Sequence, residues 1–358
     1  MRHEKQRSAK VATERPEVSA GPSVTGRRST INDIARLANV SKKTVSRVIN
    51  QSPLVTEGTR ERVSLIIRQY GYEPDPQARG LAFRRSFLIG LVYDNPNAQF
   101  VVTMQQGLLD GVRGSGFELV VHPCNRQSKT LVADVRAFAQ RQKLYGVVLL
   151  PPISENNALT SMLDELGCRY VRVASAVLDV PAKLVVSNDR IGTAEAARHL
   201  AALGHTRIGL IEGPIGFRSR IERREGFEAG LAEHDLKLAK EYCVDGAYTF
   251  DSGIEGARKL LSLKNRPTAI FACNDEMAAG VYQVAREMGL SIPEDLSIVG
   301  FDDTPVSSRL WPPLTTIRWP IVEMGRSAAA KLLEGAESDV TVPEAKLIVR
   351  NSTAPPKR

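Results

Sequence analysis

The sequence predicts an α/β protein in which a small all-α head near the N-terminus precedes a larger core of two doubly wound parallel sheets. Two patterns support this fold class. Residues 29–72 hold three short segments with helical spacing of apolar residues and capping residues between them. From Phe87 onward, short apolar strands alternate with helices, and the series begins again near residue 207. The chain of 358 residues, 42% of them hydrophobic, is long enough for two or three domains.

The first helix of the head is expected to begin after Thr30, whose side chain can cap the free N–H groups. Its apolar face is expected to consist of Ile34, Leu37 and Ala38, which recur at helical spacing. The helix should end near Asn39, because asparagine tolerates the left-handed backbone conformation.

A second helix should follow at once, because Val40 can tuck underneath and Ser41 is suited to cap it. Its predicted buried stripe consists of Val45, Val48 and Ile49. The outer face and the start of the helix then hold Lys42, Lys43, Ser46 and Arg47. A recognition helix has this arrangement, because its N-terminal side chains must reach base edges in the major groove.

A third helix, capped at Thr56 and carrying Val63, Ile66 and Ile67, should close the small core. Any one such helix is ordinary surface structure. Two caps, a tight turn, an apolar stripe and a basic outer side together predict a helix-turn-helix DNA-binding domain over residues 29–74.

The charge distribution points the same way. Residues 1–86 hold 17 Lys and Arg against 8 Asp and Glu, a net charge of +9, whereas the other residues hold 31 and 32, a net charge of −1. This asymmetry is typical of a chain in which one module binds phosphates and the other domains are near neutral. Residues 1–28 lack periodicity and are expected to form a disordered basic tail, either simply solvated or adding weak nonspecific affinity for DNA.

Other classes of protein find little support. No run of 18 apolar residues predicts a membrane span and no signal segment is evident, so a cytoplasmic location is expected. The four cysteines are widely spaced, which indicates neither a disulfide framework nor a metal site, and no cofactor is expected. Dinucleotide, Walker, GxSxG and HExxH motifs are missing, so no catalytic residue is assigned. A transport binding protein would share a two-lobed core. It would, however, need an export signal and would have no use for a basic helical head.

The core should have two lobes with a ligand-binding cleft between them, lined by loops at the carboxyl ends of the strands. The expected boundaries are about 87–187 plus 316–338 for lobe 1 and about 188–315 plus 339–353 for lobe 2. The loops expected to face the cleft are Tyr93 to Asn97, Ser187 to Arg190, Gly213 to Arg223, Asn274 with Asp275, and Phe301 to Asp303.

Several motifs in order resemble the LacI/GalR family of bacterial transcriptional regulators. They are INDIARLANVSKKTVSRVIN, PDPQARGLA, CNDEMAAGVYQVAREMGLSIPEDLSIVGFDD and PPLTTIRWP, and the resemblance spans roughly residues 29–353. It implies a homodimer, or a dimer of dimers, that binds a near-palindromic double-stranded operator. It also implies an effector-binding and dimerisation core over 87–358, shaped like a periplasmic sugar-binding protein, whose effector controls operator affinity as an inducer or a corepressor.

Matched residue by residue, the resemblance implies base contacts from Lys42, Lys43 and Arg47, and phosphate contacts from Thr44, Ser46 and Asn50. Residues 75–86 would contain a hinge helix that folds on the operator and inserts Ala78 and Leu81 into the minor groove, where apolar wedges kink the duplex. The sequence departs from the family at Asp75, where asparagine is common. A carboxylate near phosphates is unfavourable, so Asp75 is better interpreted as a helix cap.

For the cleft, the resemblance implies that Arg223 and Asp302 hold the hydroxyl groups of a mono- or disaccharide, because a guanidinium donates and an aspartate accepts. Asn274 and Asp275 would assist. Asp94 is equally well explained as an effector contact or as a turn residue. Trp311 would stack on a sugar or lie in an interface. At the position where some sugar-binding members carry aspartate, this chain has Ala174 and Ser175, so no particular sugar is implied.

Overall fold

The computed structural model describes residues 29–49, 52–72, 86–335 and 342–357. The chain divides into two compact units, Met1–Arg79 and Gly80–Arg358. Several predictions lie outside the described residues: those for the tail, for Asn50, and for the hinge helix with Ala78 and Leu81.

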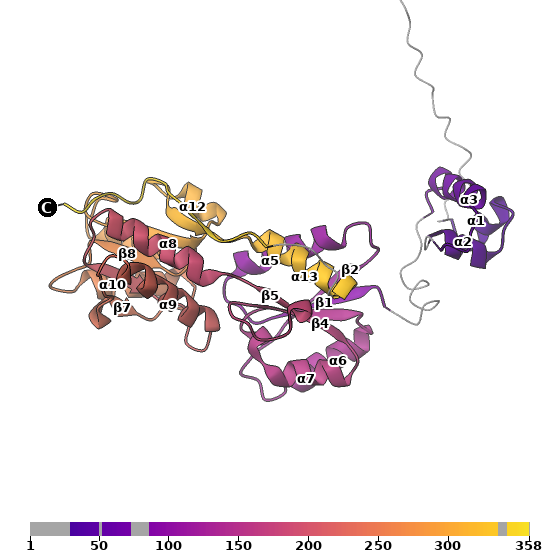
Figure 1. The fold of residues 1–358 in the computed structure, drawn as a ribbon, viewed down its shortest axis with the longest axis horizontal. Helices are drawn as coiled ribbons and strands as arrows, with labels where there is room; N and C mark the ends of the chain where they lie inside the picture. The colour runs from indigo at the N-terminus through magenta and orange to yellow at the C-terminus, as the bar shows by residue number, and fades with distance from the viewer. Residues whose placement is uncertain (1–28, 50–51, 73–85, 336–341, 358) are drawn as a thin grey trace, which may run out of the picture. The chain divides into compact units, whose positions relative to one another are not determined.

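The head contains three helices, α1 (Ile31–Leu37), α2 (Lys42–Ile49) and α3 (Glu57–Gln69) (Figure 1). The predicted caps of the first two are confirmed. Thr30 and Asp33 form a reciprocal capping box, and the Ser41 hydroxyl accepts a hydrogen bond from Thr44 N–H at 3.0 Å. Asn39 takes a left-handed conformation with φ 51°, which ends α1 and makes the turn between the two helices tight.

The core of the head is formed by Ile34, Ala35, Ala38, Val45, Val48 and Val63. The prediction for Leu37 is wrong, because its side chain is 40% exposed and Ala35 is buried in its place. In so short a helix, the face that meets α2 and α3 is made by the pair 34–35 and by residue 38. Thr56 occupies the N-cap position of α3, but its hydroxyl makes no capping hydrogen bond and instead donates to Thr59 at 3.0 Å.

Lobe 1 of the core is a parallel five-stranded sheet with the order β2-β1-β3-β4-β5. Its strands are β1 (Leu88–Tyr93), β2 (Glu118–Pro123), β3 (Gly146–Leu149), β4 (Arg169–Ala174) and β5 (Leu184–Val186). Helices α5 (Ala98–Val112) and α13 (Ile321–Glu334) pack together on one face, and α6 (Leu131–Gln142) and α7 (Asn157–Glu165) on the other (Figure 1). The short 3₁₀ helices Ile153–Glu155 and Pro181–Lys183 follow β3 and precede β5.

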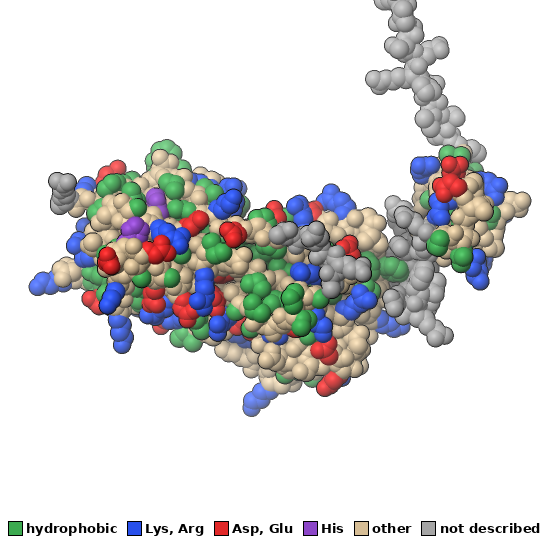
Figure 2. All heavy atoms as spheres, viewed as in Figure 1, with side chains coloured by type: hydrophobic (Ala, Val, Ile, Leu, Met, Phe, Trp, Pro, Cys, Tyr) green, Lys and Arg blue, Asp and Glu red, His purple; other side chains and the backbone are tan. Residues whose placement is uncertain are grey.

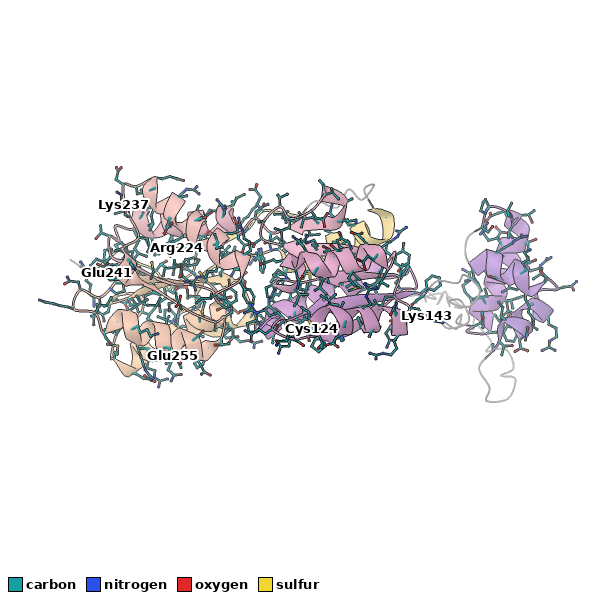
Figure 3. All side chains as sticks on the ribbon, turned by 90° about the horizontal axis from the view of Figure 1, so that it is seen from below. Cys124, Lys143, Arg224, Lys237, Glu241 and Glu255 are labelled. Atoms are coloured by element: carbon teal, nitrogen blue, oxygen red, sulfur yellow. The ribbon has the colours of Figure 1, made fainter. Side chains whose placement is uncertain are left out.

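Lobe 2 is a six-stranded sheet with the order β11-β10-β9-β8-β6-β7. Its strands are β6 (Ile208–Ile211), β7 (Cys243–Val244), β8 (Ala269–Ala272), β9 (Ser297–Asp302), β10 (Thr315–Arg318) and β11 (Lys346–Ile348). The helices are α8 (Asp189–Ala202) with α9 (Arg218–Ala232), α10 (Phe250–Leu261) with α11 (Asp275–Glu287), and the short α12 (Pro305–Arg309); the 3₁₀ helix Lys240–Tyr242 precedes β7. Figure 3 shows Arg224 of α9 and Glu255 of α10 on opposite sides of the sheet, so helices cover both faces.

Two details differ from expectation. The predicted lobe boundary before residue 316 is wrong, because β10 pairs with β9 and β11 inside lobe 2 and the chain crosses to lobe 1 only after Arg318. The sheet of lobe 2 is also not wholly parallel, since β11 runs antiparallel to β10. The helix that precedes this edge strand in the chain is α13, which packs against the sheet of lobe 1 rather than that of lobe 2.

The surface of lobe 2 carries interspersed acidic and basic side chains (Figure 2). Many of them form ion pairs, such as Arg224 with Glu228 at 2.8 Å. In the described part of the chain, no helix is long and apolar enough to span a membrane.

Candidate functional site

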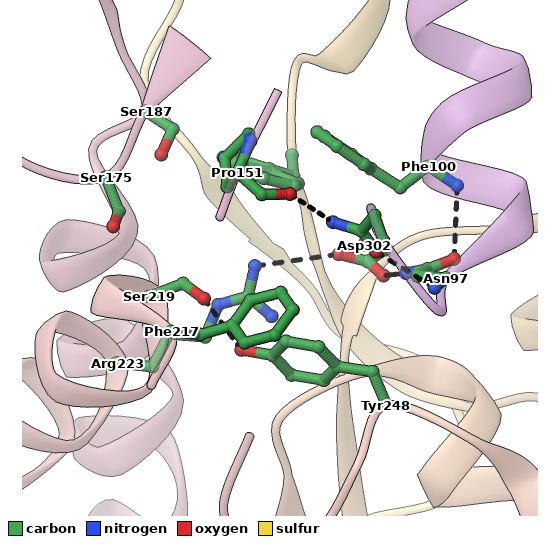
Figure 4. Close-up of a pocket in the computed structure, with 12 residues that line it drawn as sticks. Asn97, Phe100, Pro151, Ser175, Ser187, Phe217, Ser219, Arg223, Tyr248 and Asp302 are labelled. Atoms are coloured by element: carbon green, nitrogen blue, oxygen red, sulfur yellow. Dashed lines mark hydrogen bonds and ion pairs between the residues drawn. The ribbon is translucent and has the colours of Figure 1, made fainter. Parts of the chain in front are cut away.

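A pocket lies between the two lobes of the core, at the carboxyl ends of their strands. This position is typical of a small-molecule site in an α/β protein. It is lined by Asn95, Asn97, Phe100, Pro151, Ser175, Ser187, Phe217, Ser219, Arg223, Tyr248, Asp302 and Trp319 (Figure 4).

Arg223 projects from α9 and is only 3% exposed. Its Nε donates to Asp189 Oδ2 at 2.8 Å, and its Nη1 donates to the carbonyl oxygen of Cys273. The guanidinium also lies over the ring of Phe301, 3.7 Å from the centroid. Because three groups hold it, the guanidinium is fixed in place before any ligand arrives.

Asp302 ends β9 and faces Arg223 across the pocket, with 3.9 Å between Arg223 Nη2 and Asp302 Oδ1. Its Oδ2 accepts a hydrogen bond from Asn97 Nδ2 at 2.8 Å, and Asn97 belongs to lobe 1. Asp302 has a φ of 108°, a conformation that costs a non-glycine residue roughly 1–3 kcal/mol. One carboxyl group in a strained position thus joins the two lobes inside the pocket.

Aromatic rings form the apolar walls. Phe100 stacks on Trp319 with ring centroids 5.1 Å apart, and Phe217 meets Tyr248 edge-on at 5.8 Å. Ser219 lies next to this second pair, with its hydroxyl 2.9 Å from that of Tyr248. The pocket therefore combines flat apolar surfaces with a few fixed polar groups, as sites for ring-shaped polar ligands do.

Of the predicted effector contacts, Arg223 and Asp302 lie together in the pocket, whereas Asp94, Asn274 and Asp275 do not line it. Asp94 Oδ2 accepts from the Arg126 backbone N–H at 2.8 Å and so braces the loop after β2. This contact agrees with the interpretation of Asp94 as a turn residue rather than an effector contact.

The other two residues support the wall of the pocket from behind. The Asn274 side chain caps α11 and donates to the carbonyl of Tyr248 at 3.0 Å. Asp275 accepts hydrogen bonds from Thr304 and Thr316, and burial raises its pKa well above the usual range. Trp311 is 89% exposed and does not line the pocket either.

The sequence reasoning missed several lining residues. Asn97 lies in a loop that the sequence predicts to face the cleft. Its hydrogen bond to Asp302 was not predicted. Trp319 follows β10 at the end of the PPLTTIRWP motif, whereas the sequence pointed to Trp311 as the tryptophan that could stack on a sugar. Tyr248 precedes α10 with a φ of 59°, and no sequence pattern marks it as a pocket residue.

In the head, α2 presents its predicted basic face. Lys42 and Lys43 are exposed, and Arg47 and Ser46 are partly exposed, while Val45 and Val48 are buried on the opposite side. Thr44 is tied to Ser41 through a 2.9 Å contact between their hydroxyls, which fixes the start of the helix.

The pocket predicts a pH dependence of stability. Burial raises the pKa of Asp302 from 3.8 to about 7, although Arg223 opposes the shift. Between these two pKa values, the folded chain keeps a proton on Asp302 that the unfolded chain has lost. The stabilisation of the folded state by this proton is fully present below about pH 4 and is lost as the pH rises through 7. Asp302→Asn should therefore gain stability relative to the parent as pH rises from about 5 to 8, by at most ~1.4 kcal/mol per pH unit.

Urea unfolding at several pH values measures this difference. The exposed Asp251 on α10 offers a matched control, and Asp251→Asn should give a curve parallel to that of the parent. Parallel curves for Asp302→Asn as well would refute the assignment of this titration to Asp302.

The two units match different known families. Residues 30–75 match the bacterial regulatory proteins of the lacI family, and residues 197–353 match a periplasmic binding protein-like domain. The chain is 34% identical over 341 residues to the HTH-type transcriptional regulator CelR of Thermobifida fusca, covering 91% of this chain and 98% of that protein. It is 32% identical over 319 residues to the probable HTH-type transcriptional repressor ExuR of Bacillus subtilis, covering 88% and 93%.

Solved structures agree with these matches. A complex of the regulator CelR with cellobiose superposes with a TM-score of 0.67 at 30% identity, covering 91% of this chain and 100% of that one. A lac repressor dimer bound to operator and the anti-inducer ONPF gives a TM-score of 0.72 at 27% identity, covering 92% and 100%. The similarity thus covers head and core alike.

Proposed function

This chain belongs to the LacI family of bacterial regulatory proteins, and from that premise we propose that it is a transcriptional repressor whose operator affinity is controlled by a small hydroxylated effector in the pocket. The observation that carries the proposal is the position of Asp302, which faces the pocket and also bonds Asn97 of the other lobe. A ligand that engages Asp302 acts on a contact between the lobes. An effector changes a regulator's state only by binding one arrangement better than another.

The head would read DNA through α2. Lys42, Lys43 and Arg47 would contact bases, and Thr44, Ser46 and Asn50 would contact phosphates. Ala78 and Leu81 would enter the minor groove. The exposure of the basic side chains of α2 supports this assignment.

The effector would be a mono- or disaccharide, because relatives include a CelR complex with cellobiose and the ribose operon repressor of Haemophilus influenzae. Arg223 and Asp302 would contact it directly. Asp94, Asn274 and Asp275, expected earlier as effector contacts, would act instead through the loops and strand ends that they brace.

The active form would be a homodimer, or a dimer of dimers, on a near-palindromic operator in the bacterial cytoplasm. A dimeric lac repressor on its operator is among the similar structures. Since the named relatives are regulators, the chain would act by binding alone, without a catalytic residue or a cofactor.

The deciding experiment compares the full chain with one lacking residues 1–86 in a mobility-shift assay on the palindromic site upstream of its own operon. The full chain should bind in the nanomolar range, and the truncated chain at least about a thousandfold more weakly. Equal binding by the two chains would rule out the repressor. Adding an effector that alters the shift of the full chain would establish the coupling.

Arg47→Ala should relax base discrimination. The binding free energy for the preferred operator should fall by roughly 1–3 kcal/mol, and that for operators changed at the one base pair read by Arg47 should change little. Arg62→Ala is the control, because Arg62 is exposed on α3 outside the recognition helix. It should lower affinity for all sequences equally or not at all. An unchanged ranking of operator variants by Arg47→Ala would remove Arg47 from the base-reading set.

A further inference from the structure

Helix α9 begins without a cap of its own. Its N-cap residue is Phe217, whose side chain makes no capping hydrogen bond, and its first turn holds Arg218 and Arg220 but no acidic residue. The first N–H groups of a helix need acceptors, and positive side chains at this end are unfavourable because the helix dipole is positive there. The sequence of α9 therefore leaves its first turn to be satisfied by another part of the chain.

The missing acceptor comes from the other lobe. Glu155, in the 3₁₀ helix that follows β3, places both carboxylate oxygens 3.3 Å from the backbone nitrogen of Arg218, whose N–H donates to them. Glu155 thus does for α9 what an acidic residue in the first turn does within one helix. Because Glu155 belongs to lobe 1 and α9 to lobe 2, this hydrogen bond requires the lobes to be closed on each other.

A second contact joins the lobes one residue away. The guanidinium of Arg126, in the loop after β2, lies 4.6 Å from the ring centroid of Phe217, which is a cation–π distance. Asp94 holds this loop through the backbone N–H of Arg126. Burial raises the pKa of Glu155, and the positive charges of Arg218 and Arg126 partly offset the rise. We call Arg126 and Glu155 of lobe 1, with Phe217 and Arg218 of lobe 2, the α9 latch.

The latch holds the part of α9 that faces the pocket. Three residues at this end of the helix line the pocket: Phe217, Ser219 and Arg223 (Figure 4). The hydrogen bond between Asn97 and Asp302 also joins the lobes, but it lies inside the pocket, where a ligand that engages Asp302 competes with it. Arg126 and Glu155 do not line the pocket. The latch can therefore hold the lobes together whether or not the pocket is filled.

We propose that Glu155 is a positioning residue that keeps the lobes closed on the empty pocket, and that its bond to α9 sets the operator affinity of the effector-free repressor. The inference rests on the proposed function, because it assigns a regulatory contact beside the same pocket. Opening the lobes would remove the acceptor of the first N–H of α9, so the latch favours the closed arrangement. An effector then acts on an equilibrium that the protein has already biased.

The donor of the latch is a backbone group, and one substitution can remove it. Proline is well tolerated at the first position of a helix, and Phe217 already has the extended conformation that a following proline requires. Arg218→Pro therefore deletes the N–H that bonds Glu155 and keeps the helix. Arg218→Ala is the matched control, because it loses the same side chain, including its 2.7 Å ion pair with Glu222, and retains the N–H. Glu165→Ala is the control in lobe 1, where Glu165 is 66% exposed and its ion pair stays within the lobe.

Amide hydrogen exchange of the ligand-free, full-length chain measures the closure. Glu155→Ala and Arg218→Pro should each speed exchange at least about tenfold in residues 95–100 and 301–304, which a hydrogen bond joins across the pocket. Glu155→Gln keeps an acceptor oxygen and should have a smaller effect. Both controls should exchange like the parent. Faster exchange confined to the first turn of α9 would make Glu155 a local cap only and would overturn the proposal.

A mobility shift on the palindromic operator site supplies the second readout. Without effector, Glu155→Ala and Arg218→Pro should change operator affinity in the same direction and by a similar factor, at least about fivefold. The double variant should show no further change, because both substitutions remove the same bond. In the Arg218→Ala background, Glu155→Ala should keep its full effect. Effects that multiply in the double variant, or operator affinities equal to that of the parent, would also overturn the proposal.

Failure of this inference and failure of the repressor proposal give different results. Lobes that stay closed in both latch variants would contradict the role of Glu155 while the parent chain still shifted operator DNA. A parent chain that binds no operator DNA would contradict the repressor proposal, while amide exchange would still show whether the latch closes the lobes.

Discussion

Replacing Arg223 by methionine is expected to lower the free energy of unfolding by about 3–5 kcal/mol, the usual cost of removing one partner of a buried ion pair. The variant would leave Asp189, whose side chain is fully buried, without its cation, and Asp302 would lose the nearest opposing charge. Methionine retains much of the packing against Phe301, so most of the loss should be electrostatic. Urea unfolding at about pH 7.5 measures it.

The position of Arg223 offers a control on the same helix. Arg224 is 41% exposed and pairs with Glu212 and Glu228, so Arg224→Met should cost no more than about 1 kcal/mol. The same contrast should hold for ligand binding. The Arg223 variant should lose the thermal shift produced by the effector, and the Arg224 variant should keep it.

The electrostatic origin of the loss can be tested in two further ways. Asp189→Asn in the Arg223→Met background should restore part of the lost stability, because the stranded carboxylate is gone. Lowering the pH should also reduce the difference in the free energy of unfolding between the variant and the parent. Burial raises the pKa of both Asp189 and Asp302, so these carboxyl groups take up protons at a higher pH than exposed ones and no longer need the cation. A difference that is the same at about pH 5 and 8 would assign the loss to packing instead.

The sequence was sufficient for the head because its signals are local. Thr30, Asn39 and Ser41 lie within a few residues of the backbone groups that they satisfy or the turn that they form, and each has its predicted role. Leu37 shows the limit of this reasoning. Helical spacing placed it on the apolar face, but the packing of three helices selected Ala35 and left Leu37 at the edge.

In the pocket, the sequence identified the charged pair but not its surroundings. Asp302 ends β9 and Arg223 lies in α9 after β6, both in segments that the sequence places at the cleft, whereas the segments that hold Tyr248 and Trp319 were not among them. Asn274 and Asp275 lie in a loop expected to face the cleft, yet their side chains turn to the cap of α11 and to Thr304. Loop position can be predicted from strand order, but side-chain direction depends on competing partners that only the tertiary structure reveals.

Glycines allow the backbones of α5 and α13 to approach each other closely in lobe 1. A Cβ at Gly107 would overlap the carbonyl oxygen of Val322, and a Cβ at Gly325 would lie 2.8 Å from the carbonyl oxygen of Met104. Both obstacles are backbone atoms, which cannot rotate away. Since α13 follows directly after the chain crosses from lobe 2, the spacing of these two helices also fixes where the crossing segment enters lobe 1.

Gly107→Ala is therefore expected to destabilise the core by about 3 kcal/mol or more, because the helices must move apart to admit one methyl group. Helix propensity alone predicts the opposite sign, since alanine is favoured over glycine within a helix by about 1 kcal/mol. Gly58→Ala supplies the comparison: Gly58 lies in α3 with open space around its Cβ position, so that variant should be neutral or more stable. Thermal unfolding of both variants measures the difference, and a Gly107→Ala protein as stable as the parent would show that the crossing tolerates a wider spacing. If the Gly107 variant still folds at low temperature, its response to effector should also change, because Trp319 of the pocket lies in the segment that joins β10 to α13.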